Sequence, residues 1–453
     1  MNRNDEKIKM MRDEKIPKVL LNLGMPTMIG MLVSAFYNVV DAYFVGGLGT
    51  SQMGAVSVTF PIGQIIVGLA MTFGTGAASY ISRLLGEGDE KQANKTASTA
   101  LMTSLLVGVI TIIAVLCFLD SVLVSLGATA TILPYARAYA MIYIAGSILT
   151  IFNVTMNNII TSEGAAKFTM VAMLIGGGLN VIFCPIFIYT LGWGIRGAAI
   201  ATLAAQAATS LFYAWYISGR KGYLRFSLRD FYFDKTIYAQ VFKVGIPILA
   251  FQLLASASIG LTNTAASNYG DPAVAAVGIV TRLLALGTFV VFGYMKGLQP
   301  VAGYNYGAKN YDRLNEATRV SLKWAAWFCG IMAFMMIVFP DAIVSLFSKD
   351  DAMVIDIGGR ALRASGIMFV FFGFQMVYGT LFLALGKAKE GGILSISRQG
   401  IFFIPVILIL PHVIGLNGVI YSQAIADLLT VILTAVLAVK LKKELKGIAE
   451  QTA

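Results

Sequence analysis

The stretch YNVVDAYFVGGLG, residues 37–49, places a single aspartate inside an otherwise apolar run. It ends a longer apolar segment at about residues 19–45, which as a helix can cross the roughly 30 Å hydrocarbon layer of a bilayer. A carboxylate within such a span is expensive, and ionisable residues there usually serve a function. The segment therefore predicts a membrane-spanning helix in which Asp41 has a specific role.

The composition extends this prediction to the whole chain. Of the 453 residues, 57% are hydrophobic and only 13% are charged, and the mean hydropathy is +0.77. Soluble domains usually carry about 25% charged residues. Even alternation of polar and apolar residues, the mark of an outer-membrane barrel, is absent. We expect an all-α polytopic membrane protein.

Charged loops divide the apolar runs into twelve predicted spans. Their approximate limits are 19–45, 53–80, 96–118, 132–160, 168–190, 195–218, 241–267, 273–303, 317–339, 356–384, 393–411 and 416–439. Most of the 34 Lys and Arg residues fall on one side of these spans. The positive-inside rule then predicts an inner (plasma) membrane protein with both termini in the cytoplasm. The net charge of +11 is explained by this topology rather than by nucleic-acid binding.

The chain also matches itself weakly at an offset of 221 residues. Gly24-Met25-Pro26 falls on Gly245-Ile246-Pro247, and Gly76 and Gly86 fall on Gly297 and Gly307. The repeat predicts two lobes of six spans, residues 1–218 and 241–453, joined by a basic cytoplasmic linker at 219–240. An even number of spans gives both lobes the same orientation, and two such lobes around a cleft are typical of an alternating-access transporter.

Asp41 does not follow this repeat. Ser34, Tyr37, Asn38 and Asp41 share one helix face, but their equivalents in the second lobe are Ala255, Ser258, Ile259 and Thr262. Because the scaffold was duplicated without the charge, packing alone does not require the carboxylate. A desolvated carboxylate can exchange a proton, and with added neutral oxygens it can hold Na⁺. We therefore expect Asp41 to be a coupling-ion site.

Several motifs resemble the multidrug and toxic compound extrusion (MATE) transporters, and most closely the bacterial MepA-like branch. They are YNVVDAYFVGGLG, GTGAASYISRLLGEGD, GLQPVAGYNYGAKN and GLNGVIYSQAIAD, which together span nearly the whole chain. The resemblance implies a monomeric antiporter that exports cationic, amphipathic compounds, antibiotics among them, using inward H⁺ or Na⁺ flow.

The resemblance also implies a cation site in the first lobe. It carries over to Asp41 and the nearby Tyr37, to Asn180 in the fifth span and to Thr202 in the sixth. Cys184 stands where relatives usually have a second aspartate. A thiol is a poor Na⁺ ligand, so this site is expected either to bind Na⁺ weakly or to use H⁺ on Asp41 alone.

The second lobe contains charges that must pair or face water. They are Arg282, Lys296, Arg398 and Asp427. Either Lys296 pairs with Asp427, or the protein prefers neutral or anionic substrates, because a cation repels cationic compounds. Arg398 is interpreted as a structural residue that extends toward the cytoplasmic interface.

Aromatic, methionine and amide side chains are expected to line the cleft, since rings and thioethers suit flat, varied compounds. The candidates are Tyr139, Tyr143, Met156, Gln252, Met295, Lys296, Gln299, Phe374, Gln375 and Tyr378. The GxxxxGK[ST], HExxH and GxSxG motifs are absent, and the three cysteines have no paired spacing. We therefore expect no ATP-driven motor, enzyme activity, metal or cofactor.

Two other functions remain open at this point. One is a flippase or exporter of a lipid-linked or anionic substrate, which the basic residues Lys296 and Arg282 would suit. The other is a channel or membrane receptor. The two-lobe repeat and the single carboxylate of the first lobe argue against it.

Overall fold

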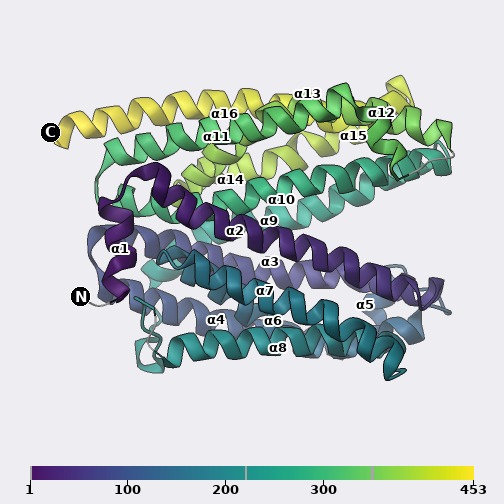
Figure 1. The fold of residues 1–453 in the computed structure, drawn as a ribbon, viewed down its shortest axis with the longest axis horizontal. Helices are drawn as coiled ribbons and strands as arrows, with labels where there is room; N and C mark the ends of the chain where they lie inside the picture. The colour runs from purple at the N-terminus through teal and green to yellow at the C-terminus, as the bar shows by residue number, and fades with distance from the viewer. Residues whose placement is uncertain (1–2, 220–221, 348–350, 453) are drawn as a thin grey trace.

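The computed structural model describes residues 3–219, 222–347 and 351–452, and these residues form two helical bundles (Figure 1). We call the first bundle the N-lobe. Its elements are α1 (Arg3–Asp13), α2 (Ile16–Gly46), α3 (Thr50–Glu87), α4 (Glu90–Cys117), α5 (Leu119–Ser125), α6 (Leu133–Ser162), α7 (Ala166–Pro185), a π-helical turn (Ile186–Thr190) and α8 (Gly194–Ser218).

The second bundle is the C-lobe, which follows a short 3-10 turn at Leu228–Asp230. Its elements are α9 (Lys235–Ser267), α10 (Asp271–Gly307), α11 (Tyr311–Val338), α12 (Pro340–Ser345), α13 (Ala352–Ala384), α14 (Ala388–Ile396), a π-helical turn (Ser397–Ile401), α15 (Phe403–Ile414) and α16 (Leu416–Thr452).

Twelve helices within the described ranges are long and apolar enough to cross a membrane, as predicted. Most predicted limits lie within a few residues of the observed ones. The larger differences are at the ends of α3 (Glu87) and α16 (Thr452) and at the starts of α4 (Glu90), α9 (Lys235) and α11 (Tyr311), so that α9 begins inside the predicted linker. The side chain of Asp234 accepts a hydrogen bond from the backbone amide of Thr236 at 2.7 Å and so starts the helix earlier.

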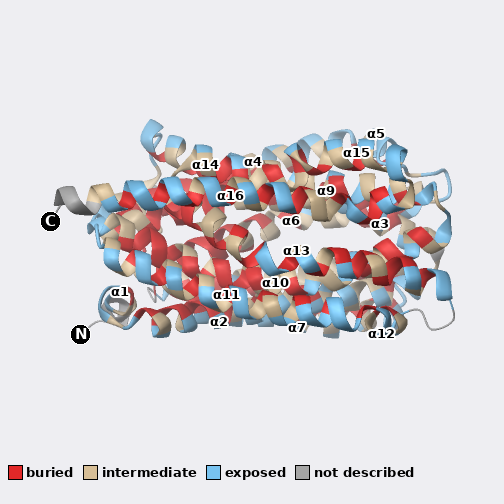
Figure 2. Cartoon of the chain, turned by 90° about the horizontal axis from the view of Figure 1, so that it is seen from above, coloured by how far each residue is buried: buried red, intermediate tan, exposed pale blue. Residues whose placement is uncertain are grey.

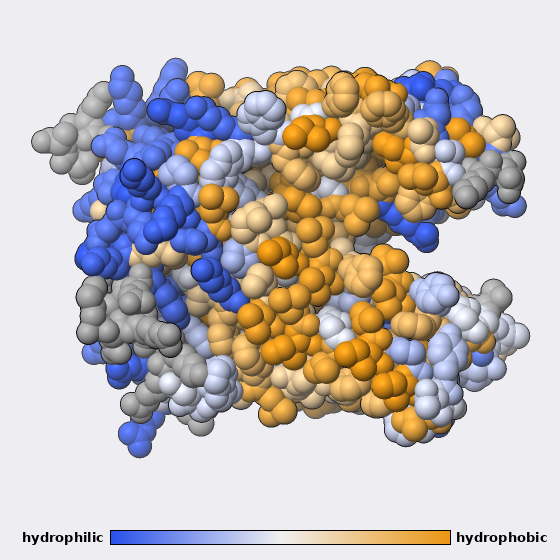
Figure 3. Space-filling view, in the orientation of Figure 1, coloured by the Kyte–Doolittle hydropathy of each residue, from blue (hydrophilic) through white to orange (hydrophobic). Residues whose placement is uncertain are grey.

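Both chain termini lie at one end of the molecule, which we call the terminal end (Figure 1). Hydrophilic residues gather at this end, apolar residues cover the middle, and a notch separates the two lobes at the opposite, open end (Figure 3). Buried residues follow the faces that the helices turn toward one another (Figure 2). Large apolar side chains such as Leu211 and Trp327 are exposed on the outside, where a bilayer would cover them.

The backbone repeats the 221-residue offset at the loops after α3 and α10. Gly88 has a left-handed φ of +81°, and its repeat equivalent Lys309 has a φ of +54°. Asp89 accepts a hydrogen bond from the amide of Gln92 and so caps α4; its equivalent Asn310 caps α11 in the same way. Lys309 is the only non-glycine with positive φ in the described chain. The second lobe therefore keeps the left-handed turn of the first, although lysine replaces the glycine that favours it.

The lobes meet at the terminal end along a seam formed by α3 and α10. A Cβ atom added to Gly86 would overlap the carbonyl oxygen of Tyr304, and one added to Gly307 would overlap that of Arg83. The two contacts are related by the same 221-residue offset, as a two-fold axis between the lobes requires. Ser79 adds a hydrogen bond to the carbonyl of Leu383 across the seam at 2.6 Å. The seam closes only because glycine brings the backbones together.

We expect Gly86→Ala and Gly307→Ala each to force the seam apart. Each should raise the free energy of the closed form by about 1–3 kcal/mol relative to the open form. Spin labels on Glu87→Cys and Ala308→Cys, with Cys117→Ser, would report this as a population of longer distances. Gly178→Ala on α7 is the matched control, because a Cβ there meets no atom within 4 Å. Equal distance distributions in all four proteins would contradict the role of the glycines.

Candidate functional site

A buried polar cluster joins three helices of the N-lobe. The Cys184 thiol of α7 donates to Oδ1 of Asp41 on α2, with Sγ and Oδ1 2.9 Å apart. One turn earlier on α7, Nδ2 of Asn180 donates to Oγ1 of Thr202 on α8 at 3.2 Å. A second, longer contact of 3.9 Å joins Cys184 Sγ to Asn180 Oδ1. The structure thus brings together Asp41, Asn180 and Thr202, which the resemblance assigned to one site, with Cys184 at the position of the expected second aspartate.

Tyrosine side chains lie around this cluster. Tyr139 and Cys184 belong to the same buried core of the N-lobe, and Tyr143 packs against that core. The Tyr139 and Tyr143 rings stack at 5.6 Å between centroids. Gly177 on α7 packs closely against α2, since an added Cβ would lie 2.7 Å from Cγ1 of Val33 and in ordinary contact, at 3.5 Å, with the Tyr37 ring. The carboxylate is therefore enclosed by apolar and phenolic groups and is only partly exposed.

The charge of this cluster rests on Asp41 alone. Among the described residues, Asp41 takes part in no ion pair, and no group of three or more His, Cys, Asp or Glu side chains could hold a metal ion. A single carboxylate beside a thiol donor can accept and release a proton. Firm Na⁺ binding needs several oxygen ligands, and here the position next to Asp41 Oδ1 is taken by sulfur.

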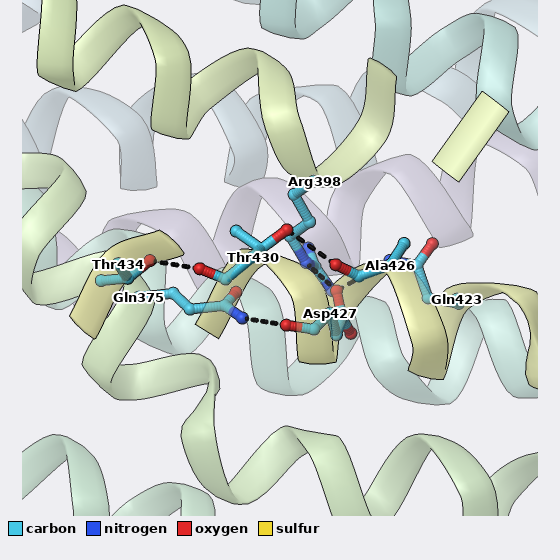
Figure 4. Close-up of polar contacts among 7 residues, drawn as sticks. All are labelled: Gln375, Arg398, Gln423, Ala426, Asp427, Thr430 and Thr434. Atoms are coloured by element: carbon cyan, nitrogen blue, oxygen red, sulfur yellow. Dashed lines mark hydrogen bonds and ion pairs between the residues drawn. The ribbon is translucent and has the colours of Figure 1, made fainter. Parts of the chain in front are cut away.

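The C-lobe contains a different polar cluster, drawn in Figure 4. Asp427 on α16 pairs with Arg398, whose Nε lies 2.7 Å from Oδ1 and Nη2 3.4 Å from Oδ2. Gln423 donates to the same carboxylate at 2.9 Å, and Gln375 donates to the carbonyl oxygen of Asp427 at 2.9 Å. The Arg398 guanidinium also lies over the Phe372 ring, 4.6 Å from its centroid. Both charges are therefore paired inside the lobe.

This cluster corrects two expectations from the sequence. Asp427 pairs with Arg398 and not with Lys296, which donates instead to Oδ1 of Asn157 at 3.0 Å. Arg398 does not extend to the interface, because its side chain is only 14% exposed and points at Asp427. The π-helical turn at Ser397–Ile401 shifts the helix register at Arg398, and such a turn was not readable from the sequence.

The remaining cleft candidates are dispersed. Gln252 bonds Gln64 across the lobes at 3.2 Å, and Gln299 bonds the carbonyl of Thr75 at 3.4 Å. Phe374 and Tyr378 pack edge to face on α13, and Arg282 is exposed on α10. Met156 and Met295 are buried in core clusters, so in this structure neither methionine faces open space.

Breaking the Arg398–Asp427 pair should destabilise the C-lobe. We expect Asp427→Asn or Arg398→Gln to lower the unfolding free energy in detergent by about 3–5 kcal/mol, because each leaves a buried charge uncompensated. The double variant Arg398→Met/Asp427→Leu should recover most of this loss. As a matched control, breaking the exposed Arg363–Asp341 pair should change the unfolding free energy by less than about 1 kcal/mol. Equal losses from both pairs would contradict this expectation.

Comparisons with known proteins agree with this architecture. The MatE family matches residues 26–186 and 247–409, one block in each lobe. Multidrug export protein MepA of Staphylococcus haemolyticus is 29% identical over 448 residues, covering 97% of each chain. MepA of Staphylococcus aureus (strain N315) is 29% identical over 447 residues, with the same coverage.

Solved structures give the same result. One is described as the outward-facing conformation of a multidrug resistance MATE family transporter; it has a TM-score of 0.91 and 32% identity, and the match covers 97% of this chain and 98% of that chain. Another, described as MATE in complex with MaL6, has a TM-score of 0.92 and 31% identity, covering 97% and 99%. Family, fold and coverage agree over both lobes, and the chain therefore belongs to the MatE family of membrane transporters, which are not enzymes.

Proposed function

We propose that the protein is a secondary active antiporter that exports amphipathic compounds in exchange for inward-moving protons carried by Asp41. The observation that carries the proposal is the N-lobe cluster, in which Asp41 is enclosed with no ion pair among the described residues. Two repeat-related lobes, sealed at one end and parted at the other, supply the alternating-access scaffold.

The orientation follows from charge. The hydrophilic terminal end carries most of the Lys and Arg residues, so we assign it to the cytoplasm, with both termini inside the plasma membrane. The notch then faces outward, and the conformation corresponds to the state named in the outward-facing relative. Each chain holds both lobes and the notch between them, so a monomer suffices for transport.

The chemistry of the cluster favours H⁺ over Na⁺. A proton needs only the Asp41 carboxylate, and loss of that proton leaves a charge that the thiol can stabilise by donating a hydrogen bond. Sodium would need the thiol displaced and both Asn180 and Thr202 turned away from each other. Proton binding therefore requires less rearrangement of the site.

A second candidate function is export of a lipid-linked or anionic compound. Lys296 favours it, because this ammonium lies between the lobes and makes no ion pair within the described residues. A cationic substrate passing between the lobes would meet that charge.

Removing the titratable charge should stop transport. We expect Asp41→Asn to reduce proton-driven ethidium efflux to background in cells that lack their own pumps, at equal membrane expression. The control Asp120→Asn, which changes an exposed carboxylate paired with Arg137, should leave efflux unchanged. Equal efflux by wild type and Asp41→Asn would rule out coupling through Asp41, and no efflux by wild type would count against export of this cation.

Restoring a second carboxylate should change the coupling ion. We expect Cys184→Asp to make efflux severalfold faster in Na⁺ than in K⁺ buffer, because it places another hard oxygen ligand beside Asp41. Cys184→Ser should remain indifferent to Na⁺, since it adds no charge. Na⁺ stimulation of the wild type itself would contradict proton coupling.

A further inference from the structure

An ammonium group lies on the boundary between the two lobes. Lys296 on α10 of the C-lobe donates to Oδ1 of Asn157 on α6 of the N-lobe at 3.0 Å. Asn157 is buried, and its Nδ2 donates in turn to the hydroxyl of Tyr213 at 3.2 Å. Within the described residues, this neutral amide is the recorded hydrogen-bond partner of Lys296 and no carboxylate pairs with it.

The other polar groups where α3, α6 and α10 meet are neutral rather than acidic. Gln299, one turn further along α10, donates to the carbonyl of Thr75 on α3 at 3.4 Å. The Thr75 hydroxyl is buried and finds no hydrogen-bond partner in the described chain. Gly74 packs beside Asn158 of α6, so α3, α6 and α10 converge here. An ammonium, an unpaired hydroxyl and amides therefore lie on the three helices that meet here.

Acids that could neutralise Lys296 are engaged elsewhere. Asp427 pairs with Arg398, and the Asp41 carboxylate accepts from Cys184. Glu163, further along α6, accepts from Lys7 at 3.4 Å, from Tyr216 and from the backbone amide of Leu224. Lys296 is only partly buried, but an ammonium between two lobes with one neutral acceptor is still costly, and such groups persist where function needs them.

Packing does not require this charge. Lys296 and Thr75 are repeat equivalents at the 221-residue offset, so they occupy matching positions on α10 and α3 across the two-fold axis. The N-lobe fills its position with a small neutral side chain. Only the C-lobe places a cation there, where it contacts the N-lobe.

We propose that Lys296, with Thr75 and Gln299, binds an anionic group of the transported compound when the seam opens at the terminal end. This inference rests on the proposed alternating-access function and names its substrate class: amphipathic compounds that carry a carboxylate, sulfonate or phosphate. The anion would replace Asn157 as the acceptor for Lys296, and Asn157 would take its place again when the seam closes. An anionic lipid headgroup offers the same chemistry.

Rhodamine B and its ethyl ester test the proposal, because they share one ring system and differ in a free carboxylate. Binding of each dye to purified protein in phosphatidylcholine nanodiscs would be measured by fluorescence anisotropy. We expect wild type to bind rhodamine B more tightly than the ester. Lys296→Gln should weaken the binding of rhodamine B about tenfold, a loss of about 1.4 kcal/mol in binding free energy. It should change the affinity for the ester by less than about twofold. Lys296→Arg should retain the preference, and Lys323→Gln, at an exposed lysine of α11, is the matched control.

The outcomes separate this inference from the proposed function. Equal binding of the two dyes by wild type overturns the inference without needing any variant, as does an equal loss of both dyes in Lys296→Gln. Lys296-dependent rhodamine B binding without transport supports the inference and overturns the exporter. Phosphatidylglycerol in the nanodiscs identifies the source: competition at Lys296 assigns the site to a lipid headgroup, and its absence assigns it to the small molecule.

Discussion

The bilayer offers no hydrogen-bond partner, so each polar group within it must be hydrogen-bonded or paired with another group of the protein. This constraint produces the all-helical fold, and it also makes the buried charges informative. Arg398 and Asp427 form an ion pair inside the C-lobe. Asp41 has only a thiol beside it, and Lys296 has only an amide. Asp41 and Lys296 thus have no opposite charge paired with them among the described residues, and a transport cycle can use such charges.

The internal repeat explains how the lobes fit together. Gly86 and Gly307 occupy equivalent places and approach equivalent carbonyls, so one duplicated contact closes both sides of the seam. Side-chain hydrogen bonds also cross the seam, such as those from Ser79 to the carbonyl of Leu383 and from Arg313 to that of Glu14, but the buried ion pairs of the described residues each lie within one lobe. The seam can therefore part without breaking a buried ion pair, and the lobes can move as rigid bodies around the axis.

Span number, approximate span position and the repeat could be predicted, because they depend on apolar run length and on glycine positions. Asp41 stood out as a lone carboxylate in a span, whereas its neighbours Asn180, Thr202 and Cys184 were predicted only from the resemblance. The partners of Lys296 and Arg398 could not. Which polar side chains meet depends on helix rotation and on local register, and the π-helical turn at Ser397–Ile401 alters that register. The contact of Asn157 with the other lobe could not be predicted either, since asparagine in a span more often bonds a neighbouring helix of its own lobe.

The polar clusters occupy the same corner of each lobe but differ in charge. Thr202 and Gln423 are repeat equivalents, and each lies in its cluster between the fifth and sixth spans of its lobe. Arg398 stands where the N-lobe has Gly177. That added base neutralises the C-lobe carboxylate, whereas Asp41 has no such partner. The two carboxylates are not repeat equivalents, since Asp41 corresponds to Thr262 and Asp427 to Gln206. Under the proposed function, the arginine neutralises the C-lobe carboxylate and leaves the exchange of a proton to Asp41.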